Sequence, residues 1–135
     1  MTRIWERLWL GSFLDAQQLA KANPHGITTV VSLCEAGVRP TSRSVNYIHV
    51  HVEDAKPLSI RKFDSIINAI AQNIFRGTVL VKCGEGISRA PTLTAAYMHL
   101  VGYEKFESCL AEIQQLPPIV SPSDILLDSI EEHLR

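Results

Sequence analysis

Residues 78–91 read TVLVKCGEGISRAP, and this stretch decides how the rest of the chain is interpreted. Residues 78–81 form a short apolar run, which is typical of a central strand in a parallel sheet. A loop with two glycines follows, and a helical pattern begins near Arg89. Strand, glycine-containing loop and helix in this order predict an anion-binding turn, because loop amides and the helix N-terminus point toward the same place.

Cysteine and arginine stand at the two ends of this loop. Cys83 and Arg89 are six positions apart. The planar guanidinium of Arg89 can bind two oxygens of a phosphate at once. The same positive field favours the thiolate of Cys83 and makes it nucleophilic. We therefore predict Cys83 as nucleophile, with a phosphate-binding set of Gly84, Glu85, Gly86, Ile87, Ser88 and Arg89. A merely structural turn would leave the spacing of cysteine and arginine unexplained.

Working outward, strand-like and helix-like segments alternate along the chain. Hydrophobic periodicity predicts strands at 4–10, 27–33, 47–52 and 78–81. It predicts helices at 12–22, from Ser59 to near Gly77, at 89–101 and at 105–115, and a last helix with Ser121 as cap and Pro122 in its first turn. This alternation predicts an α/β fold with a mainly parallel central sheet flanked by helices. Ligand sites in such sheets lie beyond the carboxyl ends of the strands.

Composition limits the remaining possibilities. A length of 135 residues with 46% hydrophobic content predicts a single domain over residues 1–135. The net charge of −1 disfavours nucleic-acid and membrane-surface binding, and no stretch is long and apolar enough to span a bilayer. The N-terminus lacks the pattern of a signal peptide. The three cysteines lack zinc-like spacing, so we expect reduced thiols and no metal. We also expect the protein to be a cytoplasmic monomer.

The segment VLVKCGEGISRAPTLTAAYM resembles the signature region of the dual-specificity phosphatases, members of the protein-tyrosine-phosphatase superfamily. The similarity extends to RLWLGSFLDAQQL, GITTVVSL and PPIVSPSDILLDSIEEHL, and so covers nearly the whole chain. It implies a protein-tyrosine-phosphatase-like fold and a phosphorylated protein or peptide as substrate. It also implies a phosphocysteine mechanism without cofactor, in which Cys83 attacks phosphorus, an acid protonates the leaving oxygen, and water releases phosphate.

The acid must lie on a loop that faces the cysteine. The segment 51–57 follows a strand and precedes a helix, on the same rim of the predicted sheet as Cys83. Asp54 lies 29 positions before Cys83, close to where similar phosphatases hold their general acid. We expect Asp54 to be the acid. Glu53 is the alternative, because a shift of one residue would exchange the two.

Three further positions bear on the chemistry. Lys82 stands where the family usually has a histidine that braces the loop, and Ala90 where a serine or threonine helps release the phosphocysteine. Slow turnover is therefore an open alternative. Cys34 ends the strand 27–33, and in some similar phosphatases a cysteine there captures the oxidised nucleophile as a disulfide. A buried structural cysteine is the other interpretation of Cys34.

Three functional classes follow from these residues. The first is an active phosphatase on phosphotyrosine, with or without phosphoserine and phosphothreonine. The second is a catalytically slow or inactive phosphate-binding module, a pseudophosphatase. The third is another cysteine enzyme, such as a rhodanese-like sulfurtransferase or an arsenate reductase. Cys83, Arg89 and Asp54 together favour the first class, because a pure binding module needs neither a nucleophile nor an acid.

Overall fold

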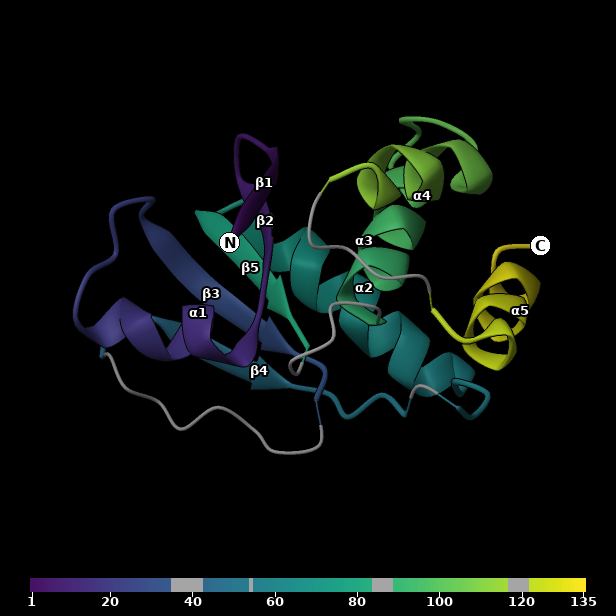
Figure 1. The fold of residues 1–135 in the computed structure, drawn as a ribbon, viewed down its shortest axis with the longest axis horizontal. Helices are drawn as coiled ribbons and strands as arrows, with labels where there is room; N and C mark the ends of the chain where they lie inside the picture. Colours follow the sequence, from purple (N-terminus) through teal and green to yellow (C-terminus); the bar gives the residue numbers. More distant parts are fainter. Residues whose placement is uncertain (35–42, 54, 84–88, 117–121) are drawn as a thin grey trace.

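A computed structural model of the chain describes residues 1–34, 43–53, 55–83, 89–116 and 122–135. The strands in this part of the chain form one sheet with the order β1-β2-β5-β3-β4 (Figure 1). The antiparallel pair β1–β2 stands at one edge, and the other neighbours are parallel. The mainly parallel sheet is thus confirmed. The strands are β1 Thr2–Trp5, β2 Leu8–Gly11, β3 Ile27–Ser32, β4 Asn46–His49 and β5 Thr78–Lys82.

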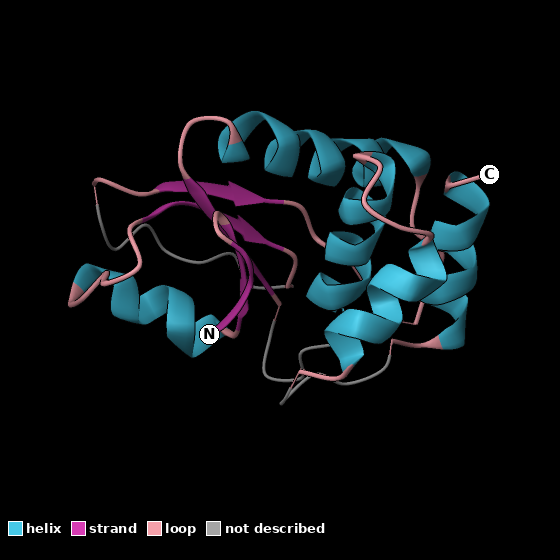
Figure 2. Ribbon diagram, turned by 90° about the horizontal axis from the view of Figure 1, so that it is seen from above, coloured by secondary structure: helices cyan, strands magenta, loops and turns pink. Residues whose placement is uncertain are grey.

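Helices cover both faces of the sheet (Figure 2). One face carries α1 and a 3₁₀ helix, η1, which pack on a small apolar cluster that includes Val30 and Leu80. The other face carries the longer helices over the larger core. The helices are α1 Phe13–Gln17, η1 Gln18–Ala20, α2 Ile60–Ile74, α3 Arg89–Leu100, α4 Phe106–Gln114 and α5 Asp124–His133. Among the described residues, no helix has the length and apolar character needed to cross a membrane.

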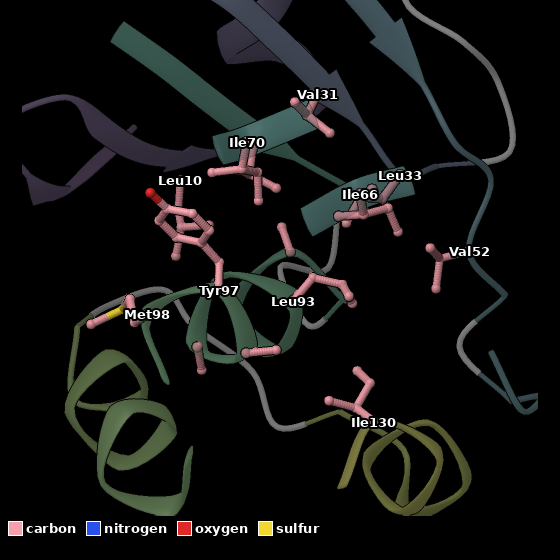
Figure 3. Close-up of a cluster of buried hydrophobic side chains, with 14 of the residues drawn as sticks. Leu10, Val31, Leu33, Val52, Ile66, Ile70, Leu93, Tyr97, Met98 and Ile130 are labelled. Atoms are coloured by element: carbon pink, nitrogen blue, oxygen red, sulfur yellow. The ribbon is translucent and has the colours of Figure 1, made fainter. Parts of the chain in front are cut away.

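Local sequence explains the elements next to the larger core. β3 is rich in β-branched residues, which fit a pleated and buried surface. α2 begins after Ser59, whose hydroxyl accepts a hydrogen bond from the Lys62 N–H, as the capping prediction requires. The buried positions of α2 recur every three or four residues and face the sheet. Figure 3 shows the resulting core, with Leu10, Val31, Leu33, Ile66, Ile70, Leu93, Tyr97 and Ile130 directed toward one another.

Two boundaries near the ends of the chain differ from the sequence prediction. The expected strand 4–10 is a hairpin instead, because the charged pair Glu6 and Arg7 forms a turn between β1 and β2. The last helix is capped by Ser123, whose hydroxyl accepts from the Leu126 N–H, and not by Ser121. A second serine, Ser123, directly follows Pro122, and it provides the cap two residues later than predicted.

Two helix ends also differ. The helix predicted for 12–22 is α-helical only to Gln17 and then tightens into η1. α2 ends at Ile74, before Gly77. Gly77 is required for a different reason, because a Cβ at this position would lie 2.1 Å from the Thr28 hydroxyl oxygen. The glycine therefore lets the turn into β5 pass close to the start of β3.

Candidate active site at the carboxyl ends of β3 and β5

β3 and β5 end side by side at one edge of the sheet. In their parallel register Ser32 pairs with Lys82, and the Leu33 N–H donates to the Lys82 carbonyl at 2.9 Å. Cys83 directly follows Lys82. Cys83 therefore lies at the carboxyl edge of the sheet, where the sequence predicts the site.

The nucleophile and the arginine of the predicted site stand at the junction of β5 and α3. Cys83 is fully buried and packs within the larger core. Arg89 is the first residue of α3, as predicted from the helical pattern. Residues 84–88, which include Gly84, Glu85, Gly86, Ile87 and Ser88, lie outside the described residues. Their contacts to phosphate therefore remain predictions.

Arg89 is held by a backbone group that no sequence pattern predicts. Its Nη1 donates to the Val52 carbonyl at 2.7 Å, in a partly buried position. Val52 is itself buried and directly precedes the two candidate acids. The guanidinium thus ties the acid-bearing segment to the start of α3. A carbonyl acceptor is present in every residue, so only the tertiary structure identifies this one.

The two candidate acids differ in what the structure reveals about them. Asp54 lies outside the described residues. Glu53 is exposed, and its Oε2 forms an ion pair with Lys56 Nζ at 3.0 Å. The hydrogen bond and the charge of Lys56 hold the pKa of Glu53 below its ordinary value. The lowered pKa disfavours the protonated form, which a general acid needs.

Lys82, which departs from the family pattern, is fully buried. Its Nζ donates to Cys34 Sγ at 2.9 Å and lies 4.6 Å from the centre of the Phe13 ring. The side chain thus turns toward the face covered by α1, whereas Cys83 packs in the core under the longer helices. The ammonium of Lys82 is thus engaged with Cys34 on this face of the sheet.

Cys34 lies directly beyond β3 in a polar environment, although only 6% of its surface is exposed. Its Sγ lies 3.6 Å from Ser32 Oγ, and its carbonyl oxygen lies 2.6 Å from His49 Nε2. Burial raises the pKa of Cys34, but the hydrogen bonds of Lys82 and Ser32 and the charges of Lys82 and Arg89 outweigh it. The pKa of Cys34 is therefore below its ordinary value. The sequence did not predict the pairing of Cys34 with Lys82.

A disulfide between Cys34 and Cys83 stays a prediction. Both are buried thiols in the structure. The influence of the Arg89 charge on Cys34 places this thiol in the field of the phosphate-binding arginine. The third cysteine, Cys109, is buried in α4, and burial raises its pKa. Cys109 thus serves as a small apolar core residue, as the sequence predicts.

Comparisons with known proteins agree with this geometry. Residues 8–135 match the family described as dual specificity phosphatase, catalytic domain. Dual specificity protein phosphatase 15 of Homo sapiens is 32% identical over 127 residues, which cover 93% of this chain and 43% of that protein. Its counterpart in Mus musculus is 29% identical and is covered to 57%. The crystal structure of DUSP15 has a TM-score of 0.86 at 30% identity, covering 99% of this chain and 86% of the other.

The chain spans about half the length of the curated relatives that it matches. The matched part contains β2 and every later strand and helix described above. It therefore includes the carboxyl edge of the sheet, with Cys34, Val52, Cys83 and Arg89.

Proposed function

The chain belongs to the dual specificity phosphatase family, and on this premise we propose that it hydrolyses phosphate monoesters on proteins through a phosphocysteine intermediate. Phosphotyrosine is the proposed substrate group, with phosphoserine and phosphothreonine as further substrates. The observation that carries the proposal is the placement of Cys83 at the end of β5 and of Arg89 at the start of α3. A thiol at the end of a strand and a guanidinium at the start of the next helix flank one anion site.

In the proposed first step, Cys83 Sγ attacks phosphorus and the bond from phosphorus to the leaving oxygen breaks. Arg89 binds two oxygens of the transferring group and stabilises the charge that they carry. The loop amides of residues 84–88 supply the other donors. To bind phosphate, the Arg89 guanidinium can release the Val52 carbonyl. Alternatively, Nη1 keeps its hydrogen bond to that carbonyl and the other N–H groups of the guanidinium bind the phosphate.

We propose Asp54 as the acid that protonates the leaving oxygen and as the base that later activates water. The surroundings of Glu53 support this choice, because its ion pair with Lys56 lowers its pKa and so disfavours its protonated form. In the second step, water attacks the phosphocysteine, Asp54 takes the proton, and inorganic phosphate leaves. No metal or organic cofactor takes part in either step.

Slow turnover is the second candidate function, and two observations favour it. Lys82 stands where the family usually has a histidine, and its ammonium donates to Cys34. Ala90 is fully buried and offers no hydroxyl to the departing sulfur. A domain that forms the phosphocysteine but hydrolyses it slowly would keep the phosphate on Cys83 after the dephosphorylated protein has left.

Hydrolysis of p-nitrophenyl phosphate by the wild type and by Cys83→Ser tests the proposal. We expect activity in the wild type and none in the variant. An initial burst of nitrophenol, equal to the enzyme concentration, would identify slow phosphocysteine hydrolysis, and Ala90→Ser should then raise the steady rate. Phosphate binding without hydrolysis by the wild type would refute the enzymatic proposal and leave the binding module.

Asp54→Asn, with Glu53→Gln as matched control, tests the choice of acid. Removal of the acid should slow cleavage of alkyl phosphates about 10²-fold or more, because their leaving oxygen needs a proton. Cleavage of p-nitrophenyl phosphate should change much less. If Glu53→Gln shows this difference and Asp54→Asn does not, the two residues exchange roles.

We further propose that the domain works as a monomer in the cytoplasm. Cys34, Cys83 and Cys109 are all thiols, and proteins of reducing compartments keep their cysteines in this form. Sedimentation of the purified chain and fractionation of cells would test the two parts of this proposal separately.

A further inference from the structure

Lys82 and Cys34 form a buried contact that has no role in the phosphate hydrolysis proposed above. The Nζ and Sγ atoms are 2.9 Å apart, and both side chains are buried. The register of β3 and β5 brings the two side chains together, because Lys82 pairs with Ser32 and Cys34 follows Ser32 by two residues. The Phe13 ring below the ammonium holds Nζ in place from the other side.

A sulfur and an amine at this distance can form a covalent bond once the sulfur is oxidised. We propose that Lys82 and Cys34 form a redox-sensitive modification site, in which oxidised Cys34 is captured by Lys82 Nζ as a sulfenamide. The oxidant is hydrogen peroxide. This modification concerns Lys82 and Cys34 alone, so it does not depend on phosphatase activity.

The chemistry begins with the Cys34 thiolate, whose charge the Lys82 ammonium balances. The thiolate attacks peroxide, gains one oxygen as sulfenate, and releases water after proton transfer. Lys82 then gives a proton to the sulfenate oxygen, and its neutral amine attacks sulfur. The S–O bond breaks, a second water leaves, and an S–N bond remains. In total, thiolate, ammonium and one peroxide give the sulfenamide and two waters, so sulfur loses two electrons and the peroxide oxygens gain them.

Three observations favour Lys82 as the captor of oxidised Cys34. The amine already lies at 2.9 Å, so capture requires no movement of the backbone. The lowered pKa of Cys34 favours the thiolate, the form that peroxide oxidises. Burial limits the access of external thiols, which would otherwise compete for the sulfenic acid. A disulfide with Cys83 is the competing product, and the experiment below separates the two.

Trypsin distinguishes the two products because Lys82 and Cys83 are adjacent. Cleavage normally occurs after Lys82 and gives the peptides 77–82 and 83–89, while Cys34 lies in the peptide 22–43. A disulfide would join 22–43 to 83–89. A sulfenamide removes the lysine charge that trypsin needs, so it would join 22–43 to the uncut peptide 77–89. Either linkage lowers the mass by two hydrogen atoms.

The test treats the folded chain with mild peroxide, blocks remaining thiols and analyses tryptic peptides under non-reducing conditions. We expect 22–43 linked to 77–89 in the wild type and in Cys83→Ser, which lacks the thiol needed for the disulfide. Lys82→Arg is the matched control, because it keeps a positive charge but has no amine that forms this bond. It should lose the linkage, and so should wild type treated in denaturant.

Linkage of 22–43 to 83–89 with cleavage after Lys82 would overturn the proposal in favour of the disulfide. Cys34 recovered as sulfinic acid or as unmodified thiol in Cys83→Ser would overturn it as well. Circular dichroism shows whether Lys82→Arg folds. If it does not, Cys83→Ser and the denatured wild type decide the question by themselves.

Discussion

Replacement of each partner in the buried Lys82–Cys34 pair should cost the protein very different amounts of stability. Cys34→Ala leaves the Lys82 ammonium fully buried without its sulfur acceptor. Lys82→Met removes the ammonium beside Cys34, but a thiolate there can take up a proton and become a neutral thiol. The side chain of methionine also has nearly the size of the lysine stem. The two single variants therefore separate an uncompensated charge from the mere loss of one hydrogen bond.

The structure sets the size of each effect. Removal of one partner from a buried ion pair costs about 3–5 kcal/mol. The Phe13 ring remains under the ammonium in Cys34→Ala and offsets about 1 kcal/mol, so we expect a loss of about 3 kcal/mol. Lys82→Met should cost about 1 kcal/mol, the worth of one hydrogen bond. The double variant carries no buried charge, and should lose about 2 kcal/mol rather than the additive 4.

Urea denaturation followed by circular dichroism measures these differences at pH 7. With a slope of about 2 kcal/mol/M, Cys34→Ala should lower the midpoint by about 1.5 M, and the double variant by about 1 M. Cys34→Ser is the matched control, because it keeps an acceptor that does not ionise at this pH. Recovery of stability on adding Lys82→Met to Cys34→Ala is the critical result. If the double variant is less stable than Cys34→Ala, the ammonium does not depend on Cys34.

Three further predictions follow from the same contacts. Arg89→Lys should lower kcat/KM about 10²-fold or more, because it removes bidentate phosphate binding, and a loss below tenfold would contradict this role. Cys34 should react with iodoacetamide faster than Cys109 at pH 7, because the pKa of Cys34 is lowered and that of Cys109 is raised. Mass spectrometry of the labelled peptides measures the two rates, and equal rates would refute the prediction. Ser129→Ala should cost about 1–3 kcal/mol in urea denaturation, because its hydroxyl accepts from the Leu58 N–H at 2.9 Å and donates to the Leu58 carbonyl at 3.1 Å in a buried position. A loss below about 0.5 kcal/mol would show that this link between α5 and the segment before α2 is dispensable.

Much of the fold follows from local patterns in the sequence. β3 and β5 are short apolar or β-branched runs, and α2 has both an N-cap and a hydrophobic stripe, so these elements were predicted within one or two residues. The hairpin of β1 and β2 was not predicted, because an alternating pattern of seven residues is compatible with one strand as well as with two short strands. Pairing with β5 decides between them, and that pairing is not local.

For the candidate site, the sequence identified the reactive side chains but not the residues that contact them. The spacing of Cys83 and Arg89, together with the strand before it and the helix after it, favours an anion-binding loop, and the chain order places them at the edge of a parallel sheet. Asp54 and residues 84–88 remain predictions on that basis. Lys82 was recognised as a departure from the family, but the direction of its side chain depends on the register of two strands 50 positions apart.

The amino-acid sequence by itself determined the fold class, because this depends on periodicity, capping and the order of elements along one chain. Its resemblance to the dual-specificity phosphatases indicated the family, and its spacing predicted Cys83 and Arg89 as the two ends of a phosphate-binding loop. Only the tertiary structure decided that Lys82 faces Cys34 and that Val52 holds Arg89. These contacts join residues 48 and 37 positions apart, and both need atoms placed within about 3 Å. Side-chain direction and local charge come from packing and strand register, which no short stretch of sequence contains.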